Sequence, residues 1–273
     1  MTWSPPTGVL GRIVAESIAR VAELRADRAR VSLLERGLED APATTGFRDA
    51  LLREHVGVIA EVKRRSPSKG EINSALSAAA QARAYEAGGA TAISVLTEPA
   101  HFSGSVDDLA EASRAVKIPV LRKDFLVDEL QLVEARMAGA SAVLLIARAL
   151  SPAVLARLFD FAGTIGLEAL VEVRCESELD CALEVGAGVI GVNERDLETL
   201  EMEPAVRERL MPRIPPSVVA VAESGIRTAA DVEHAADLGA DAVLVGSSLS
   251  ASATPESAVR ALAAVRRRGR LAG

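Results

Sequence analysis

Aromatic side chains are scarce in this sequence: they make up 3% of its 273 residues, with one Trp, one Tyr and five Phe. Proteins that bind single-stranded nucleic acids usually stack the bases on such rings. The 38 acidic residues outnumber the 31 basic ones, and the net charge of −7 gives a polyanion no general attraction. We therefore expect no nucleic-acid partner.

Long apolar runs are also missing. No window reaches the roughly 18 uninterrupted apolar residues of a membrane span, and residues 1–7 (MTWSPPT) lack the basic start and apolar core of a signal peptide. The two cysteines, Cys175 and Cys181, lie in one predicted strand-to-helix segment without a nearby histidine, which favours neither a disulfide nor a zinc site. We expect no membrane partner, no metal site and a cytoplasmic location.

Apolar residues, in contrast, make up 49% of the chain, which is enough for a large core. The length fits one eight-unit α/β barrel of about 250 residues, or two ordinary domains. Residues from about 8 to 40 show helical spacing, with one apolar stripe. This stripe consists of Leu10, Ile13, Val14, Ser17, Ile18, Val21 and Leu24. We interpret residues 1–48 as a helical extension that packs on a body formed by residues 49–273.

The body repeats one unit eight times, about every 27 residues: a short apolar run, a polar loop and an Ala- and Leu-rich amphipathic stretch. Apolar strands that alternate with helices are typical of a parallel sheet covered by helices. An open doubly wound sheet would rarely use eight such even units, so we predict an α/β protein with a single (β/α)8 TIM barrel. The predicted strands are 57–63, 90–96, 119–123, 141–146, 168–173, 188–193, 217–222 and 241–246.

Alternate units differ in a regular way. The second, fourth, sixth and eighth runs follow a Gly-Ala pair, which is typical of a helix that ends in a left-handed turn. The other four runs end in charged residues, and in a barrel these ends carry the active site. A charge at that position is costly unless it is paired or used, so either an ion-pair network or acid–base chemistry is indicated. The residues are Glu61, Lys63, Lys123, Glu172 and Glu223.

Other chemistries find little support. The chain has no G-x-S-x-G or H-E-x-x-H motif and no Cys–His pair, and its three histidines are scattered, with His101 a weak candidate. Residues 186–191 match G-x-G-x-x-G, but they end a helix and begin a strand, the reverse of a dinucleotide site. We therefore expect no nucleotide cofactor. Gly-Ser loops follow the seventh and eighth runs, where barrels often bind phosphate through backbone N–H groups.

Motifs along the body carry a resemblance to a known family. They are 59–70 (IAEVKRRSPSKG), 94–98 (SVLTE), 102–105 (FSGS), 121–125 (LRKDF), 170–173 (LVEV), 191–193 (GVN), 195–197 (RDL), 222–226 (AESGI) and 246–249 (GSSL). In this order they resemble indole-3-glycerol-phosphate synthases of tryptophan biosynthesis. The resemblance implies a lyase that closes the ring of 1-(2-carboxyphenylamino)-1-deoxyribulose 5-phosphate with loss of CO2 and water, without a cofactor.

The resemblance also implies roles for the charged residues. Lys123 would be the general acid that protonates the ketone oxygen, and Glu172 the general base of the dehydration. Lys63 would bind the substrate carboxylate, and the division of labour between the two lysines stays open. Glu61 and Glu223 would keep the lysines charged and orient substrate hydroxyls.

The remaining residues are implied to bind substrate. Asn193 would hydrogen-bond the intermediate. The phosphate would be bound by Ser66, Gly225, Gly246 and Ser247, with Ser224 and Arg195 nearby. The anthranilate ring would lie against Phe102, Phe125 and Leu197, for which packing at the barrel mouth is the alternative.

One residue departs from the family pattern. Glu194 stands where a small polar residue is usual, and we expect its carboxylate to pair with Arg195 or to lie in solvent. Two other functions stay open from the sequence: another phosphate-sugar barrel, such as a phosphoribosyl isomerase, and a non-catalytic barrel. Other enzymes of tryptophan synthesis are conceivable partners beside the small phosphorylated substrate.

Overall fold

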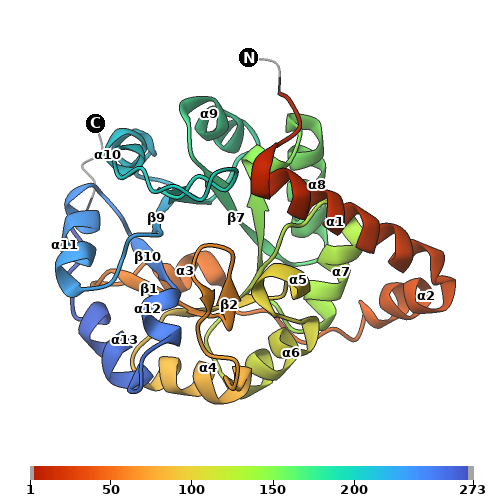
Figure 1. The fold of residues 1–273 in the computed structure, drawn as a ribbon, viewed down its shortest axis with the longest axis horizontal. Helices are drawn as coiled ribbons and strands as arrows, with labels where there is room; N and C mark the ends of the chain where they lie inside the picture. The colour runs from red at the N-terminus through yellow and green to blue at the C-terminus, as the bar shows by residue number, and fades with distance from the viewer. Residues whose placement is uncertain (1–2, 270–273) are drawn as a thin grey trace.

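Eight parallel strands form a closed barrel inside a ring of helices in the computed structural model, which describes residues 3–269 (Figure 1). Around the barrel the order is β1-β10-β9-β8-β7-β6-β5-β4, so strands adjacent in sequence are adjacent in space and the last pairs with the first. All eight predicted strands and the predicted TIM barrel are confirmed. The strands are β1 (Gly57–Val62), β4 (Ala92–Leu96), β5 (Val120–Lys123), β6 (Ala142–Ile146), β7 (Glu168–Val173), β8 (Val189–Asn193), β9 (Val219–Glu223) and β10 (Ala242–Val245).

Helices follow these strands and cover the outside of the barrel. The longer ones are α4 (Ala78–Ala87), α6 (Val106–Ala115), α7 (Glu129–Met137), α8 (Pro152–Thr164), α9 (Glu176–Glu184), α11 (Ala229–Asp237) and α13 (Pro255–Ala263). Shorter helical segments are α3 (Phe47–Leu51), α5 (Pro99–Phe102), η1 (Ala147–Ala149), α10 (Ala205–Leu210), η2 (Met211–Arg213) and α12 (Ser247–Ser250). The helix before each even-numbered barrel strand ends at a glycine with φ between 79° and 96°, as the Gly-Ala pairs predict.

The barrel strands are buried on both faces because their Val, Ile, Leu and Ala side chains pack inward or against the helices. The register of β1 with its two neighbours closes the barrel, with Gly57 beside Ala242 and Ile59 beside Ala92. Polar and charged residues interrupt this apolar core chiefly at the carboxyl ends of the strands. Most of the buried polar and charged side chains of the barrel therefore lie at one of its two mouths.

The extension contains two helices where the sequence suggested one continuous helical stretch: α1 (Gly8–Ala26) and α2 (Arg28–Gly37). They are separate because Asp27 leaves the helical conformation and its side chain accepts the Arg30 amide, which begins α2. Most of the predicted stripe of α1 is buried, but Ile18 is 55% exposed and was wrongly included. Helix α2 packs against α7 and projects beyond the ring of helices (Figure 1).

The loop after β1 holds a short hairpin that the sequence did not predict. Its strands, β2 (Arg65–Ser66) and β3 (Gly70–Glu71), are antiparallel and frame the residues 67–69 beside the barrel mouth. Within the described part of the chain, none of the helices is both long and apolar enough to cross a membrane. The division into 1–48 and 49–273 stays a prediction, and residues 1–2 and 270–273 of these two pieces lie outside the described residues.

Candidate active site

Lys123, at the end of β5, lies within a ring of three carboxylates. Its Nζ is 3.9 Å from Oε2 of Glu61, 3.9 Å from Oε2 of Glu172 and 4.0 Å from Oε2 of Glu223. These side chains come from β1, β5, β7 and β9, the four strands that the sequence predicts to end in charge. The ring is buried, since each of the three carboxylates is at most 3% exposed. The structure therefore brings together residues that lie up to 162 positions apart in the sequence.

A second lysine joins the ring at one side. Lys63 Nζ lies 2.6 Å from Oε1 of Glu61. Burial opposes ionisation of Glu61, but the charges of Lys63 and Lys123 outweigh it and lower the pKa of Glu61. Burial also opposes the charge of Lys123, but Glu61, Glu172 and Glu223 outweigh that penalty and raise the pKa of Lys123. Lys123 is thus a cation over the whole physiological pH range.

Glu223 behaves differently from Glu61. Burial, and next the negative charge of Glu172, raise the pKa of Glu223 well above its ordinary value although Lys123 acts against them. Glu223 fits because residue 191 beside it is glycine: a Cβ at Gly191 would overlap Oε1 of Glu223. Among residues 3–269, Oε1 of Glu223 and Oε2 of Glu172 are buried without a hydrogen-bond partner. Such atoms are suited to a hydroxyl or a proton brought by a ligand.

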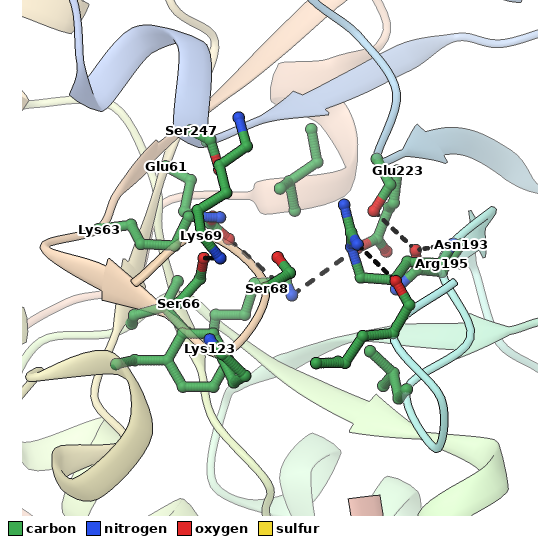
Figure 2. A pocket seen from close by; sticks show the side chains of 18 of the residues that line it. Glu61, Lys63, Ser66, Ser68, Lys69, Lys123, Asn193, Arg195, Glu223 and Ser247 are labelled. Atoms are coloured by element: carbon green, nitrogen blue, oxygen red, sulfur yellow. Dashed lines mark hydrogen bonds and ion pairs between the residues drawn. The ribbon is translucent and has the colours of Figure 1, made fainter. Parts of the chain in front are cut away.

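One pocket lies at the barrel mouth and is lined by Lys123 and two of the three carboxylates, Glu61 and Glu223. Figure 2 shows acidic and basic side chains from opposite sides of the barrel pointing toward its interior. Every site residue that the sequence predicts lines this pocket except Glu172, which lines a smaller adjoining pocket. The two pockets share four residues: Ile146, Asn193, Arg195 and Leu197. The residues brought together in the larger pocket are Glu61, Lys63, Ser66, Phe102, Lys123, Phe125, Asn193, Arg195, Leu197, Glu223, Ser224, Gly225, Gly246 and Ser247.

One end of the pocket is formed by the loops after β9 and β10. Ser224 and Gly225 are both left-handed, with φ of 64° and 73°, and the Ser224 hydroxyl donates to Oδ1 of Asn193 at 2.8 Å. Gly246 lies against the ring, where a Cβ would overlap Oε1 of Glu61 and lie 2.8 Å from Nζ of Lys63. The backbone therefore approaches the pocket at both loops, an arrangement that suits an oxyanion.

Two further cations line this end, and the sequence reasoning missed both. Lys69 belongs to the β2–β3 hairpin, and Arg227 follows the loop after β9. Burial, followed by the charges of Arg227, Lys63 and Arg195, lowers the pKa of Lys69. No salt bridge within 4 Å joins Lys69 or Arg227 to a carboxylate in the described part of the chain. The signal was present, because Lys69 lies within 59–70 and Arg227 directly follows 222–226.

The other end of the pocket is apolar. The rings of Phe102 and Phe125 have centroids 6.0 Å apart and planes inclined by 37°. Leu197 and two residues of α1, Val9 and Ile13, complete this lining. The extension thus contributes directly to the pocket, which the sequence did not specify. A flat aromatic ring would find apolar contacts here from both phenylalanines, Leu197 and α1.

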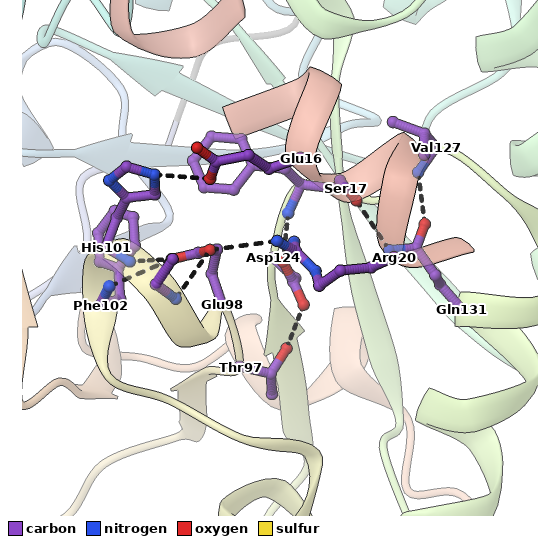
Figure 3. A network of polar contacts seen from close by, with 12 residues as sticks. Glu16, Ser17, Arg20, Thr97, Glu98, His101, Phe102, Asp124, Val127 and Gln131 are labelled. Atoms are coloured by element: carbon purple, nitrogen blue, oxygen red, sulfur yellow. Dashed lines mark hydrogen bonds and ion pairs between the residues drawn. The ribbon is translucent and has the colours of Figure 1, made fainter. Parts of the chain in front are cut away.

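Polar contacts fix α1 to the segments that carry both phenylalanines (Figure 3). Ser17 donates to the carbonyl of Phe125 at 2.7 Å and accepts from Gln131 at 3.0 Å. Arg20 lies 3.4 Å from Glu98 and 4.0 Å from Asp124. These contacts join the extension to the loops after β4 and β5.

Glu98 also caps α5. Its carboxylate accepts the backbone amides of Ala100, His101 and Phe102. His101, a weak catalytic candidate from the sequence, lies outside the large pocket and pairs with Glu16 at 2.8 Å. Glu16, Glu98 and His101 lie close enough to hold a cation, but the Glu98 oxygens are already occupied by three amides. The cluster is therefore a structural link between α1 and α5.

The expectation for Glu194 was wrong. Its carboxylate is 5% exposed and pairs with Arg207 at 2.8 Å, so it neither pairs with Arg195 nor lies in solvent. Arg195 instead donates its amide to Oδ1 of Asn193 and its guanidinium to the Leu200 carbonyl. Arg207 could not be predicted as the partner, because it lies 13 residues further along the chain, on α10.

Comparison with known proteins decides the family. A family model described as indole-3-glycerol phosphate synthase matches residues 10–262. This chain belongs to the indole-3-glycerol phosphate synthase family. Its curated relatives support this. An indole-3-glycerol phosphate synthase 2 of Streptomyces coelicolor is 46% identical over 256 residues, covering 94% of this chain and 99% of the relative. An indole-3-glycerol phosphate synthase of Mycolicibacterium smegmatis is 49% identical over 240 residues, covering 87% and 88%.

The barrel itself is shared more widely than the indole-3-glycerol phosphate synthase family. A thiamine phosphate pyrophosphorylase from Pyrococcus furiosus superposes with a TM-score of 0.58 at 16% identity, covering 80% of this chain and 96% of that one. At this identity the likeness concerns the fold alone. The family match and the close relatives favour the synthase over a phosphoribosyl isomerase or a non-catalytic barrel.

Proposed function

We propose that this protein is a carboxy-lyase, a carbon–carbon lyase that converts 1-(2-carboxyphenylamino)-1-deoxyribulose 5-phosphate to indole-3-glycerol phosphate, CO2 and water. One observation carries the proposal: Lys123 lies among three carboxylates in a pocket with an aromatic-lined end and a Gly-Ser end. The substrate has the same polarity, with an anthranilate ring at one end and a phosphate at the other. The anthranilate ring contacts Phe102, Phe125 and Leu197. The phosphate is bound by Ser66, Gly225, Gly246 and Ser247.

Ring closure needs a proton donor at the ketone. The ring carbon that carries the carboxylate attacks the ketone carbon, and Lys123 protonates the carbonyl oxygen, which becomes a hydroxyl. The carboxylate then leaves as CO2, and its bonding electrons restore the aromatic ring. A raised pKa keeps Lys123 charged, and the neighbouring carboxylates return a proton to it after each turnover.

Lys63 and the carboxylates serve the other steps. Lys63 binds the substrate carboxylate, although its pairing with Glu61 also suits proton donation to the departing hydroxyl. Glu172 removes a proton as that hydroxyl leaves as water. Its Oε2 accepts no hydrogen bond from residues 3–269, which supports this role. Glu223, Glu61 and Asn193 orient the hydroxyls of the sugar chain.

Arg195 and Ser224 hold the pocket in shape as well as contacting substrate, since both hydrogen-bond to Asn193. We propose that the protein is located in the cytoplasm. Other enzymes of tryptophan synthesis are its proposed partners, because the proposed substrate and product are intermediates of that pathway. No cofactor enters any of the proposed steps.

The test is direct. The purified protein is mixed with the anilino-deoxyribulose phosphate without metal or cofactor, and indole formation is followed by absorbance and fluorescence. Lys123→Ala and the bulkier Lys123→Met should abolish turnover while circular dichroism shows a folded barrel. Lys117→Met, which replaces an exposed lysine, should keep full activity. No indole signal from folded wild-type protein would overturn the proposal, and full activity in the Lys123 variants would remove the assigned role.

A further inference from the structure

A buried ion pair lies directly beneath one of the two Gly-Ser loops. Glu194 follows the last residue of β8, and Arg207 lies on α10. Oε1 of Glu194 is 2.8 Å from Nη2 of Arg207, and the two residues are 5% and 4% exposed. Neither residue lines the pocket. The pair is therefore separate from the ring of charges around Lys123.

The pair supports the loop from below. Nη2 of Arg207 also donates to the backbone carbonyl of Ser224 at 2.9 Å. A Cβ on Gly225 would overlap Oε2 of Glu194 and lie 3.1 Å from Nη2 of Arg207, so the backbone of Gly225 rests against both partners. Ser224 and Gly225 thus have their position defined by the pair on one side, while the other side faces the pocket.

The loop needs such support because its conformation is strained. Ser224 is one of three non-glycine residues with positive φ in the described part of the chain. This conformation is unfavourable for a residue with a Cβ, and it persists only where surrounding contacts over-determine it. Two contacts do so at Ser224: its side chain bonds Asn193, and its carbonyl accepts from Arg207.

Stability alone does not account for the pair. Burial raises the pKa of Glu194 in spite of the charge of Arg207, and burial lowers the pKa of Arg207 in spite of Glu194. For both groups, removal from water outweighs the attraction between the partners. Buried ion pairs of this kind can often be replaced by apolar residues without loss of stability, so the contacts of this pair with the loop above it are the better guide to its role.

We propose that Glu194 and Arg207 are positioning residues that hold Ser224 and Gly225 in the conformation that binds the substrate phosphate. The inference rests on the proposed function, in which this loop binds that phosphate. Neither residue touches substrate. Loss of the pair should weaken phosphate binding and leave the chemistry at Lys123 nearly intact.

The test compares variants in two measurements: calorimetric titration with inorganic phosphate, and steady-state kinetics with the full substrate. The main variant is the double substitution Glu194→Gln and Arg207→Met, which leaves no unpaired charge buried. We expect the Kd for phosphate and KM to rise about tenfold, the effect of one lost hydrogen bond to a loop carbonyl, while kcat stays within about threefold. The matched control is Arg267→Met, which removes an ion pair with Asp241 at the opposite end of the barrel; it should lower the melting temperature without changing phosphate affinity.

The possible outcomes separate the two proposals. A folded double variant that binds phosphate as tightly as the wild type would overturn the positioning role. Wild-type protein that neither binds phosphate nor is inhibited by it would instead contradict the proposed phosphate site. If the double variant fails to fold, Arg207→Lys is compared with a second double variant, Glu194→Gln and Arg207→Gln, which also leaves no unpaired charge buried. Lysine keeps the charge and a donor, so it should restore much of the affinity, and equal Kd values for the two variants would contradict the proposal.

Discussion

Ser17 of α1 donates a hydrogen bond of 2.7 Å to the carbonyl of Phe125, across 108 positions of the sequence. Phe125 is two residues beyond Lys123 and forms part of the apolar end of the pocket. The bond therefore links the helical extension to the segment that carries the proposed general acid. Because Val9 and Ile13 of the same helix also line the pocket, α1 is part of the site and not only a cover for the barrel.

Ser17→Ala tests this link. The substitution leaves the Phe125 carbonyl and the Gln131 amide without their present partner, and we expect a loss of about 1–2 kcal/mol in the free energy of unfolding. We also expect KM to rise several-fold, because Phe125 becomes less firmly placed. Ser113→Ala is the matched control: its hydroxyl also donates to a carbonyl, that of Gly139, far from the pocket. Urea denaturation and kinetics of both variants would show whether only Ser17 affects KM.

Glu61→Gln should move the alkaline limb of the pH–rate profile. Glu61 is the first of the three carboxylates that raise the pKa of Lys123, and a general acid acts only while protonated. Activity is lost as the pH rises through the pKa of Lys123, so removing one negative charge should shift that loss to lower pH. The control is Glu54→Gln, which breaks an exposed pair with Arg266. An unchanged alkaline limb in Glu61→Gln, measured from pH 6 to 11, would argue against Lys123 as the acid.

The barrel strands and the charges at their ends could be predicted because both are local in the sequence. A run such as 168–173 is a strand by its composition, and Glu172 lies at its carboxyl end whatever surrounds it. Barrel closure then brings all such ends to one mouth, so Lys123 and Glu223 could be placed together before any distance was known. The chemical roles of these charged residues were predicted from the resemblance to the synthase family.

Side-chain partners could not be predicted in the same way. Glu194 was recognised as unusual, but Arg207 comes from α10, and the contact depends on how that helix lies against β8. The break between α1 and α2 was missed because the capping by Asp27 competes with helical spacing that continues through it. Lys69 and Arg227 were missed because loop residues have no periodicity to show which way they face. These errors concern the directions in which side chains and helices point, and a pattern of residue types along the chain does not determine those directions.

Arg227→Gln should weaken binding of the substrate phosphate. Arg227 lines the Gly-Ser end of the pocket and has no carboxylate partner among residues 3–269. Burial is the main cause that lowers the pKa values of Lys69 and Arg195, and the charge of Arg227 is the second cause for both. A phosphate dianion between these cations would relieve their repulsion. We expect KM to rise about tenfold, the equivalent of one charge-assisted hydrogen bond. The KM of the variant should also change less with salt concentration than the KM of the wild type.

The control for Arg227 is Arg260→Gln on the surface of α13. Arg260 pairs with Glu256 on the same exposed helix face, and its loss should leave KM unchanged at every salt concentration. Kinetics between low and moderate ionic strength distinguish the two variants. Equal KM values for Arg227→Gln and the wild type would show that Arg227 takes no part in binding.

Asp108→Asn should reduce stability in a pH-dependent manner. Arg64, which follows Lys63, binds the two oxygens of Asp108 at 2.6 and 2.7 Å and so ties the loop after β1 to α6. Burial opposes ionisation of Asp108, but the bonds from Arg64 and Ser105 outweigh it and lower its pKa in the folded protein. The unfolded chain therefore holds this proton more tightly than the folded one. The stabilisation is complete above the unfolded pKa of about 3.9 and is lost as the pH falls through the folded value.

We accordingly expect Asp108→Asn to cost about 2 kcal/mol at pH 7, and this difference should shrink as the pH falls below about 4, the unfolded pKa of an aspartate. Asp107→Asn replaces the neighbouring exposed carboxylate in the same first turn of α6 and should change stability by only a few tenths of a kcal/mol. Urea denaturation of both variants and the wild type at pH 7 and at pH 3 gives the comparison. A destabilisation by Asp108→Asn that is equally large at both pH values would mean that its carboxylate acts through packing, and that the ion pair with Arg64 does not hold the β1 loop in place.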